Sequence, residues 1–188
     1  MTRFWEPRVD AWVVQVLPGE LHVTREPDVI ATVLGSCVAA CVRDVKRHVG
    51  GMNHFLLPQA PKGTTADLAS TARYGVYALE LLLNKVMRGV GRREDLEVKV
   101  FGGGRVLSTG GDIGRGNIEF VRTFFRDEGI RIVSEDVGDT VARRLRYWPM
   151  TGRVQLMRMP MDKASRVIAE EEAVATRLVP TGGAIELF

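Results

Sequence analysis

The sequence contains few side chains suited to nucleophilic chemistry: two cysteines and three histidines. Cys37 ends an apolar run and comes directly after Gly35 and Ser36. Glycine there lets the chain turn sharply, and backbone N–H groups beside the thiol could hold the oxyanion of a tetrahedral intermediate. A thiolate at such a turn would attack acyl carbons. The same pattern also fits a small buried cysteine, so the local sequence leaves both interpretations open.

A nucleophilic thiol needs a base, and His54 is the best placed histidine. It lies in the apolar segment 51–58, where a buried imidazole needs partners for its ring nitrogens. Pairing with Cys37 across neighbouring strands would satisfy one nitrogen and activate the thiol. A core histidine with other partners is the alternative. His22 falls in an early, half-exposed strand and His48 in a polar turn, so both are weaker candidates.

The remaining cysteine and the glycine-rich segments are predicted to be structural. In an extended segment Cys41 lies roughly 13 Å from Cys37 on the same face, too far for a disulfide without backbone movement. No C-x-x-C or H-x-x-x-H spacing predicts a metal site. The segments 102–105 and 110–116 match neither a P-loop nor a dinucleotide fingerprint, and we interpret them as tight turns that line a site.

The elements that position these residues include more strands than helices. Apolar or alternating segments predict strands at 12–17, 21–24, 29–34, 38–43, 49–57, 96–101, 130–134, 143–148, 154–159 and 185–188. Helices are predicted at 67–88, at 118–128 with Asn117 as its N-cap, and at 162–178. Because the helices are spread along the chain, we predict a mixed α/β domain with helices packed over a β core.

Length and composition limit the class of protein. The 188 residues suit one domain, and the balance of 45% hydrophobic and 26% charged residues is typical of a globular chain. The net charge of +3 comes from interleaved acidic and basic residues, so we expect no nucleic-acid binding. No apolar run reaches the roughly 18 residues of a membrane span, and no signal peptide is evident. We therefore expect no membrane insertion and a cytoplasmic location, where both cysteines remain thiols.

Several motifs in one order resemble a known family. T-V-L-G-S-C-V-A-A-C at 32–41 is followed by G-G-M-N-H-F-L-L-P at 50–58, A-R-Y-G at 72–75, K-V-F-G-G-G at 99–104, I-G-R-G-N at 113–117, S-E-D-V-G at 134–138 and G-G-A-I-E-L-F at 182–188. The chain thereby resembles the CheD family of chemoreceptor glutamine deamidases over most of residues 13–159. An ordered set of motifs is far more specific than any one of them.

The resemblance implies a mixed α+β fold similar to the catalytic domain of cytotoxic necrotizing factor toxins, with a β-sandwich-like core flanked by helices. The single deamidase domain, 1–188, would have its core at about 13–159 and a C-terminal helix and short strand within 162–188. The resemblance also implies Cys37 as nucleophile, His54 as general base and Thr32 as the third catalytic residue. Some members carry that threonine one position earlier, where this chain has Ala31.

The implied activity is that of a protein-glutamine glutaminase, which converts receptor glutamines to glutamate and acts on methyl-glutamate esters. Gly35, Ser36 and Asn53 are the candidate oxyanion or site-lining residues, and no metal or cofactor is required. The implied partners are the cytoplasmic domains of methyl-accepting chemoreceptors and a CheC-type phosphatase. An alternative function is therefore a regulatory docking module for that phosphatase, with little catalysis. A redox switch of Cys37 and Cys41 is a weaker third interpretation.

Overall fold

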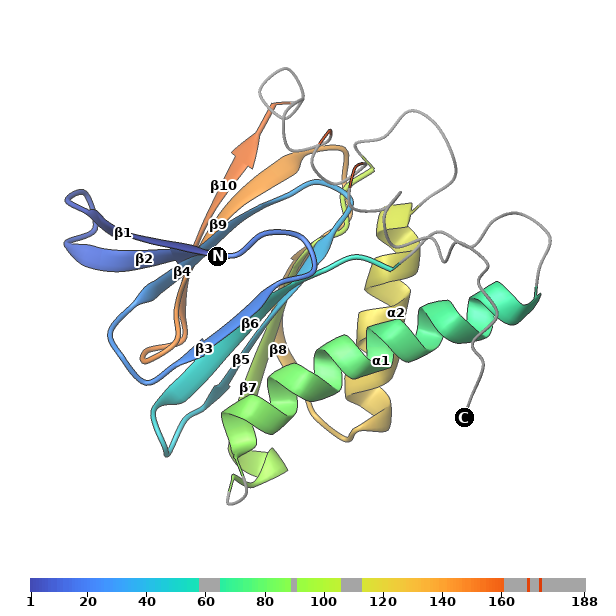
Figure 1. The fold of residues 1–188 in the computed structure, drawn as a ribbon, viewed down its shortest axis with the longest axis horizontal. Helices are drawn as coiled ribbons and strands as arrows, with labels where there is room; N and C mark the ends of the chain where they lie inside the picture. Colours follow the sequence, from blue (N-terminus) through green and yellow to red (C-terminus); the bar gives the residue numbers. More distant parts are fainter. Residues whose placement is uncertain (58–64, 89–90, 106–112, 161–168, 170–172, 174–188) are drawn as a thin grey trace, which may run out of the picture.

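Two five-stranded sheets and two α-helices form the described part of the chain in three layers (Figure 1). The structure is a computed structural model that describes residues 1–57, 65–88, 91–105, 113–160, 169 and 173. One sheet, here sheet A, packs against the inner face of the other, sheet B, and the helices cover the outer face of sheet B. The predicted mixed α+β class with a sandwich-like core flanked by helices is confirmed.

Sheet A consists, in spatial order, of β1 (Thr2–Glu6), β2 (Ala11–Gln15), β4 (Val29–Leu34), β9 (Ala142–Trp148) and β10 (Arg153–Met159). Sheet B consists of β3 (Leu21–Thr24), β6 (Val49–Phe55), β5 (Val38–Asp44), β7 (Leu96–Gly102) and β8 (Ile132–Val137). Neighbouring strands are antiparallel except for β2–β4 and β7–β8, which are parallel. The chain passes from one sheet to the other between β2 and β3, between β3 and β4 and again between β4 and β5, and β4 contacts β6 across the space between the sheets.

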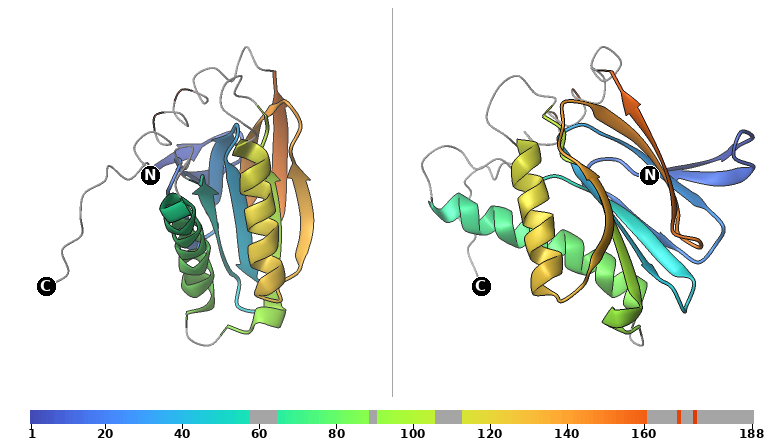
Figure 2. Two further views of the ribbon diagram at one scale, coloured as in Figure 1. Left: turned by 90° about the vertical axis from the view of Figure 1, so that its right-hand side faces the viewer. Right: turned by 180° about the vertical axis from the view of Figure 1, so that it is seen from behind.

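The helices α1 (Thr65–Met87) and α2 (Ile113–Asp127) lie on one face of sheet B (Figure 2). The central strand β5 is buried on both faces, which explains its nearly continuous apolar run. Val38, Ala40 and Val42 pack against the helices, whereas Ala39 and Cys41 face sheet A. Sheet B thus separates two apolar cores, one under the helices and one between the sheets.

Most predicted elements are present, but one strand was missed, the start of one helix was wrong, and the strand predicted at 130–134 is observed at Ile132–Val137. The strand β1 was not predicted, because Phe4 and Trp5 are exposed and the segment shows no alternation of buried and exposed residues. The helix α2 begins at Ile113, so Asn117 lies inside it and does not cap it. Glycine disfavours helices, yet a Cβ at Gly114 would lie 2.3 Å from the Gly103 carbonyl oxygen. The segment 102–104 is here called the glycine loop. Close packing of α2 on this loop therefore requires a glycine within the helix.

The predicted helix at 162–178, apart from residues 169 and 173, and the predicted strand at 185–188 lie outside the described residues. Within the described ranges, neither helix combines the length and the apolar character needed to cross a membrane.

Candidate active site

The side chains of Thr32 and His54 meet between the two sheets. Thr32 Oγ1, on β4 of sheet A, lies 2.8 Å from Nδ1 of His54, on β6 of sheet B. Both residues are buried, with exposed fractions of 3% and 2%. Successive residues of a strand point to opposite faces, and Ala31 lines a groove on the outer face of sheet A. Of the two neighbouring positions 31 and 32, position 32 is therefore the one whose side chain contacts the imidazole.

A second hydrogen bond of Thr32 determines the tautomer of His54. The Thr32 hydroxyl donates to the carbonyl oxygen of Val16, just after β2, at 2.7 Å. A hydroxyl has one proton to donate, so Oγ1 must accept the bond from the imidazole, and Nδ1 carries the hydrogen. In the neutral ring Nε2 then holds the lone pair and is the basic nitrogen.

Strand pairing brings Cys37 to the same face as His54. His54 pairs directly with Ala39 in the antiparallel register of β5 and β6. Cys37, two residues before Ala39, belongs with it to the core between the sheets and has an exposed fraction of 0%. Cys37 is thus a diagonal cross-strand neighbour of His54, a relation in which the residues lie about 7–8 Å apart and long side chains interact.

Three successive carbonyl groups fix the turn that carries Cys37. The carbonyl of Gly35 accepts a bond from Gly104 N at 2.8 Å, and that of Cys37 accepts one from Gly103 N at 2.7 Å. Between them, the carbonyl of Ser36 accepts a bond from Asn117 Nδ2 at 3.0 Å. These peptide bonds are trans, since the described residues include no cis peptide bond, so the N–H groups of the same peptide planes point away from the glycine loop and α2.

The same asparagine also holds the end of the strand that carries His54. Asn117 is fully buried, and its Oδ1 accepts a hydrogen bond from Leu57 N at 2.8 Å. One side-chain amide therefore connects the turn of Cys37 to the segment three residues after His54. The I-G-R-G-N motif suggested only an N-cap here, because both partners of Asn117 are distant in sequence.

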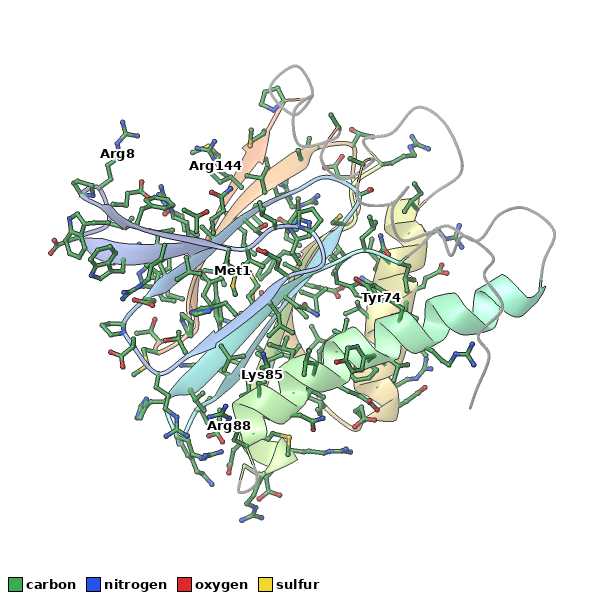
Figure 3. The ribbon with its side chains drawn as sticks, viewed as in Figure 1. Met1, Arg8, Tyr74, Lys85, Arg88 and Arg144 are labelled. Atoms are coloured by element: carbon green, nitrogen blue, oxygen red, sulfur yellow. The ribbon has the colours of Figure 1, made fainter. Side chains whose placement is uncertain are left out.

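Tyr74 is a further site residue, noted in the sequence only as part of the A-R-Y-G motif. It lies inside α1, nine residues after the start of that helix at Thr65 (Figure 3). Burial raises the pKa of its phenol, and Cys37 raises that pKa further, which indicates that the two groups are close. Its hydroxyl lies 3.6 Å from the position that a Cβ on Gly19 would take, and Gly19 N donates to the His54 carbonyl oxygen at 2.8 Å.

The other candidate cysteine and histidines, and the side chain of Asn53, lie apart from the group formed by Thr32, His54 and Cys37. Asn53 precedes His54 on β6 and faces the helices, where its Oδ1 accepts a bond from Ala40 N at 3.1 Å. Cys41 is buried between the sheets, and neither cysteine forms a disulfide. His22 lies on the edge strand β3, and His48 lies in a turn with a positive φ of 49°. Among the described histidines, only His54 is hydrogen-bonded to a threonine and shares a face with a cysteine.

Comparisons with known proteins agree with this arrangement. A family model described as CheD chemotactic sensory transduction matches residues 56–158. Proteins named "Probable chemoreceptor glutamine deamidase CheD" are similar over the whole chain and include residues 32–55. The protein of Halorhodospira halophila is 42% identical, over 100% of this chain and 90% of its own. The protein of Methylobacillus flagellatus is 43% identical, over 98% of this chain and 94% of its own. The protein of Hydrogenovibrio crunogenus is 42% identical, over 100% of this chain and 100% of its own. The chain belongs to the CheD family.

Proposed function

We propose that the protein deamidates glutamine side chains of chemoreceptors, with Cys37 as nucleophile, His54 as general base and Thr32 as the residue that orients the base. The observation that carries this proposal is the buried hydrogen bond from Nδ1 of His54 to Thr32, beside a cysteine on the same face of sheet B. The names of the relatives support the substrate, because each is called a chemoreceptor glutamine deamidase.

The residue types define the chemical steps. Cys37 Sγ attacks the amide carbon of the glutamine side chain while Nε2 of His54 takes the thiol proton. The tetrahedral intermediate collapses when that proton passes to the amide nitrogen, so ammonia leaves and a thioester remains. His54 then takes a proton from water as the water oxygen attacks the thioester carbon. Glutamate leaves, and the proton returns to the thiolate. Methyl-glutamate esters present the same acyl carbon and would react by the same steps.

The developing oxyanion requires hydrogen-bond donors. The peptide N–H groups of Ser36 and Cys37 are our candidates, because the carbonyls of Gly35, Ser36 and Cys37 are held on the opposite side by the glycine loop and Asn117. This assignment uses the peptide planes between Gly35 and Ser36 and between Ser36 and Cys37, and it needs no side chain. Asn53 supports the site indirectly, through its bond to Ala40 in β5.

The substrate proposal predicts where the protein acts and which partners it has. We propose that it works in the cytoplasm, on the cytoplasmic domains of methyl-accepting receptors, where two cysteines that form no disulfide stay reduced. A CheC-type phosphatase is a further predicted partner. Docking of that partner should survive Cys37→Ala in a pull-down, whereas catalysis should not.

The direct test is mass spectrometry of receptor cytoplasmic fragments incubated with the full chain. We expect specific glutamines to become glutamates with release of ammonia, at sites that stay unchanged without the protein. Binding of the fragments without any conversion would contradict the deamidase proposal and favour the docking alternative.

Thr32→Val tests the orienting role of the hydroxyl. Valine has nearly the same shape, but it removes the acceptor from Nδ1 of His54 and the donor from the Val16 carbonyl. We expect kcat to fall by about 10²-fold with little change in KM, because the base loses its fixed tautomer. Thr32→Ser keeps the hydroxyl and should restore most of the rate. A kcat for Thr32→Val within about twofold of wild type would remove Thr32 from the mechanism.

Asn117→Ala tests the connection between the two halves of the site. It leaves Ser36 O and Leu57 N without their partners, so we expect a loss of about 2–3 kcal/mol in the free energy of unfolding. We also expect kcat to fall by about tenfold to a hundredfold, because Cys37 and His54 lose their relative position. Urea unfolding and steady-state kinetics measure the two effects.

The matched control for Asn117→Ala is Asn84→Ala, at an exposed asparagine of α1. That variant should match wild type in both stability and kcat. Equal kinetic effects of the two substitutions would argue against a positioning role for Asn117.

A further inference from the structure

A cavity separate from the Cys37 site lies between the edge strand β3 and the last turn of α1. It has a volume of about 550 Å³, and the residues that line it include Arg25, Lys85 and Arg88. Lys85 follows Tyr74 by eleven residues on α1, so the cavity is about 16 Å further along the helix from the phenol near Cys37. Figure 3 shows Lys85 and Arg88 at the end of α1 opposite to Tyr74.

The charges around this cavity are of one sign. Of the described residues, none that lines it is acidic. Arg25, Lys85 and Arg88 make no side-chain hydrogen bond or ion pair within the described ranges, whereas many other arginines of the chain pair with a carboxylate. Three cationic groups without a counter-charge around one concave surface raise the local potential and attract anions.

The imidazole of His22 lies on the opposite face of β3 from these cationic groups. His22 pairs with Met52, which belongs to the core between the sheets, whereas its neighbour Val23 packs in the core under the helices. The groups available to an anion in this cavity are therefore the side chains of Arg25, Lys85 and Arg88.

The backbone of Arg88 has a conformation that is rare for a residue other than glycine. Arg88 follows the last residue of α1 and has a φ of 26°, in the left-handed region that favours glycine at the end of a helix. An arginine at this position is unfavourable for the backbone, yet it brings a guanidinium to the cavity. Basic residues at a helix C-terminus also complement the helix dipole. The dipole does not explain Arg25, which comes to the same cavity from the position directly after β3.

We propose that this cavity binds a small phosphorylated anion. Arginine side chains present paired N–H donors that match phosphate oxygens, and lysine adds a compact charge. The volume falls within the range of small-molecule sites. The proposal does not involve Cys37, His54 or Thr32, so it does not depend on the deamidase assignment.

The test is to titrate the full chain with inorganic phosphate and with pyrophosphate at constant ionic strength. Calorimetry and NMR measure the binding. We expect saturable binding of pyrophosphate with a Kd below about 1 mM, and weaker binding of inorganic phosphate. Lys85→Gln and Arg88→Gln should each raise the Kd about tenfold, the loss expected for one charged hydrogen bond. Chloride at equal ionic strength should not bind.

The matched controls are Arg8→Gln and Arg144→Gln, which remove exposed arginines far from this cavity (Figure 3). Neither should change the Kd. The proposal is overturned if binding does not saturate, or if the control substitutions weaken it as much as Lys85→Gln. It is equally overturned if a glutamate-rich peptide binds at this surface and pyrophosphate does not, because the surface would then be a protein-docking site.

Discussion

Cys37→Ala is expected to abolish the conversion of receptor glutamine to glutamate, with kcat lower by about 10⁵-fold or more. The substitution removes the only atom that forms the covalent bond to the substrate, and His54 alone would have to activate water without a thioester step. Since Cys37 is fully buried in the core between the sheets, alanine leaves only a small space there. Mass spectrometry of receptor fragments measures the rate, and circular dichroism verifies the fold.

Cys41→Ala is the matched control. Cys41 lies on the same face of β5, four residues from Cys37, and burial raises the pKa of its thiol far above the ordinary value. A thiol that stays protonated is a poor nucleophile. We therefore expect normal turnover, with a loss of stability of about 1 kcal/mol. If turnover survived Cys37→Ala but not Cys41→Ala in a folded protein, the nucleophile would be Cys41 and the assignment to Cys37 would be wrong.

The second large effect is expected on stability. Arg143, on β9 of sheet A, is almost fully buried and donates to Asp136, on β8 of sheet B, at 2.7 Å. Asp136 also accepts a bond from Arg158 at 2.9 Å. Asp136→Ala leaves the Arg143 guanidinium buried without its carboxylate, so we expect a loss of about 3 kcal/mol in the free energy of unfolding. Urea unfolding measures it.

Asp127→Ala is the appropriate comparison, because its ion pair with Arg126 is exposed. Exposed pairs contribute little, so this variant should differ from wild type by less than about 0.5 kcal/mol. A similar loss of stability in both variants would mean that the burial of Arg143 has no special consequence.

The contribution of Asp136 also depends on pH. Burial acts to raise the pKa of its carboxyl, but the hydrogen bonds from Arg143 and Arg158 outweigh burial and lower that pKa. A carboxyl with a lowered pKa stabilises the folded state above its ordinary pKa, near 4, and this stability is lost as the pH falls through the lowered value. The difference between wild type and Asp136→Ala should therefore narrow in unfolding experiments below about pH 4.

Local sequence patterns predicted most of the fold. The strands at 21–24 and 29–34 were predicted with their observed bounds, because alternation and β-branched runs are read within a few residues. The bounds of α2 were not predicted, because its glycine-rich first turn packs on a loop that is distant in sequence. In general, contacts that join remote segments override local propensity.

In the candidate site too, local motifs could be read from the sequence, whereas contacts between remote segments could not. Cys37, His54 and Thr32 were named from motifs, and the structure adds that Thr32 contacts Nδ1 of His54. The connecting role of Asn117 could not be predicted, since its partners lie 81 and 60 residues away in sequence. Tyr74 belonged to a quoted motif, but only the packing of α1 over sheet B brings it near Cys37.

The position of Thr32 has a consequence for folding. His54 belongs to sheet B and Cys37 directly precedes its strand β5, whereas Thr32 belongs to sheet A and the carbonyl that fixes its hydroxyl directly follows β2 of that sheet. Neither sheet alone contains an oriented base. A refolding chain should therefore regain turnover only after the two sheets have docked, however early the strands of sheet B pair. Recovery of activity would then report the closure of the sandwich, separately from the formation of its secondary structure.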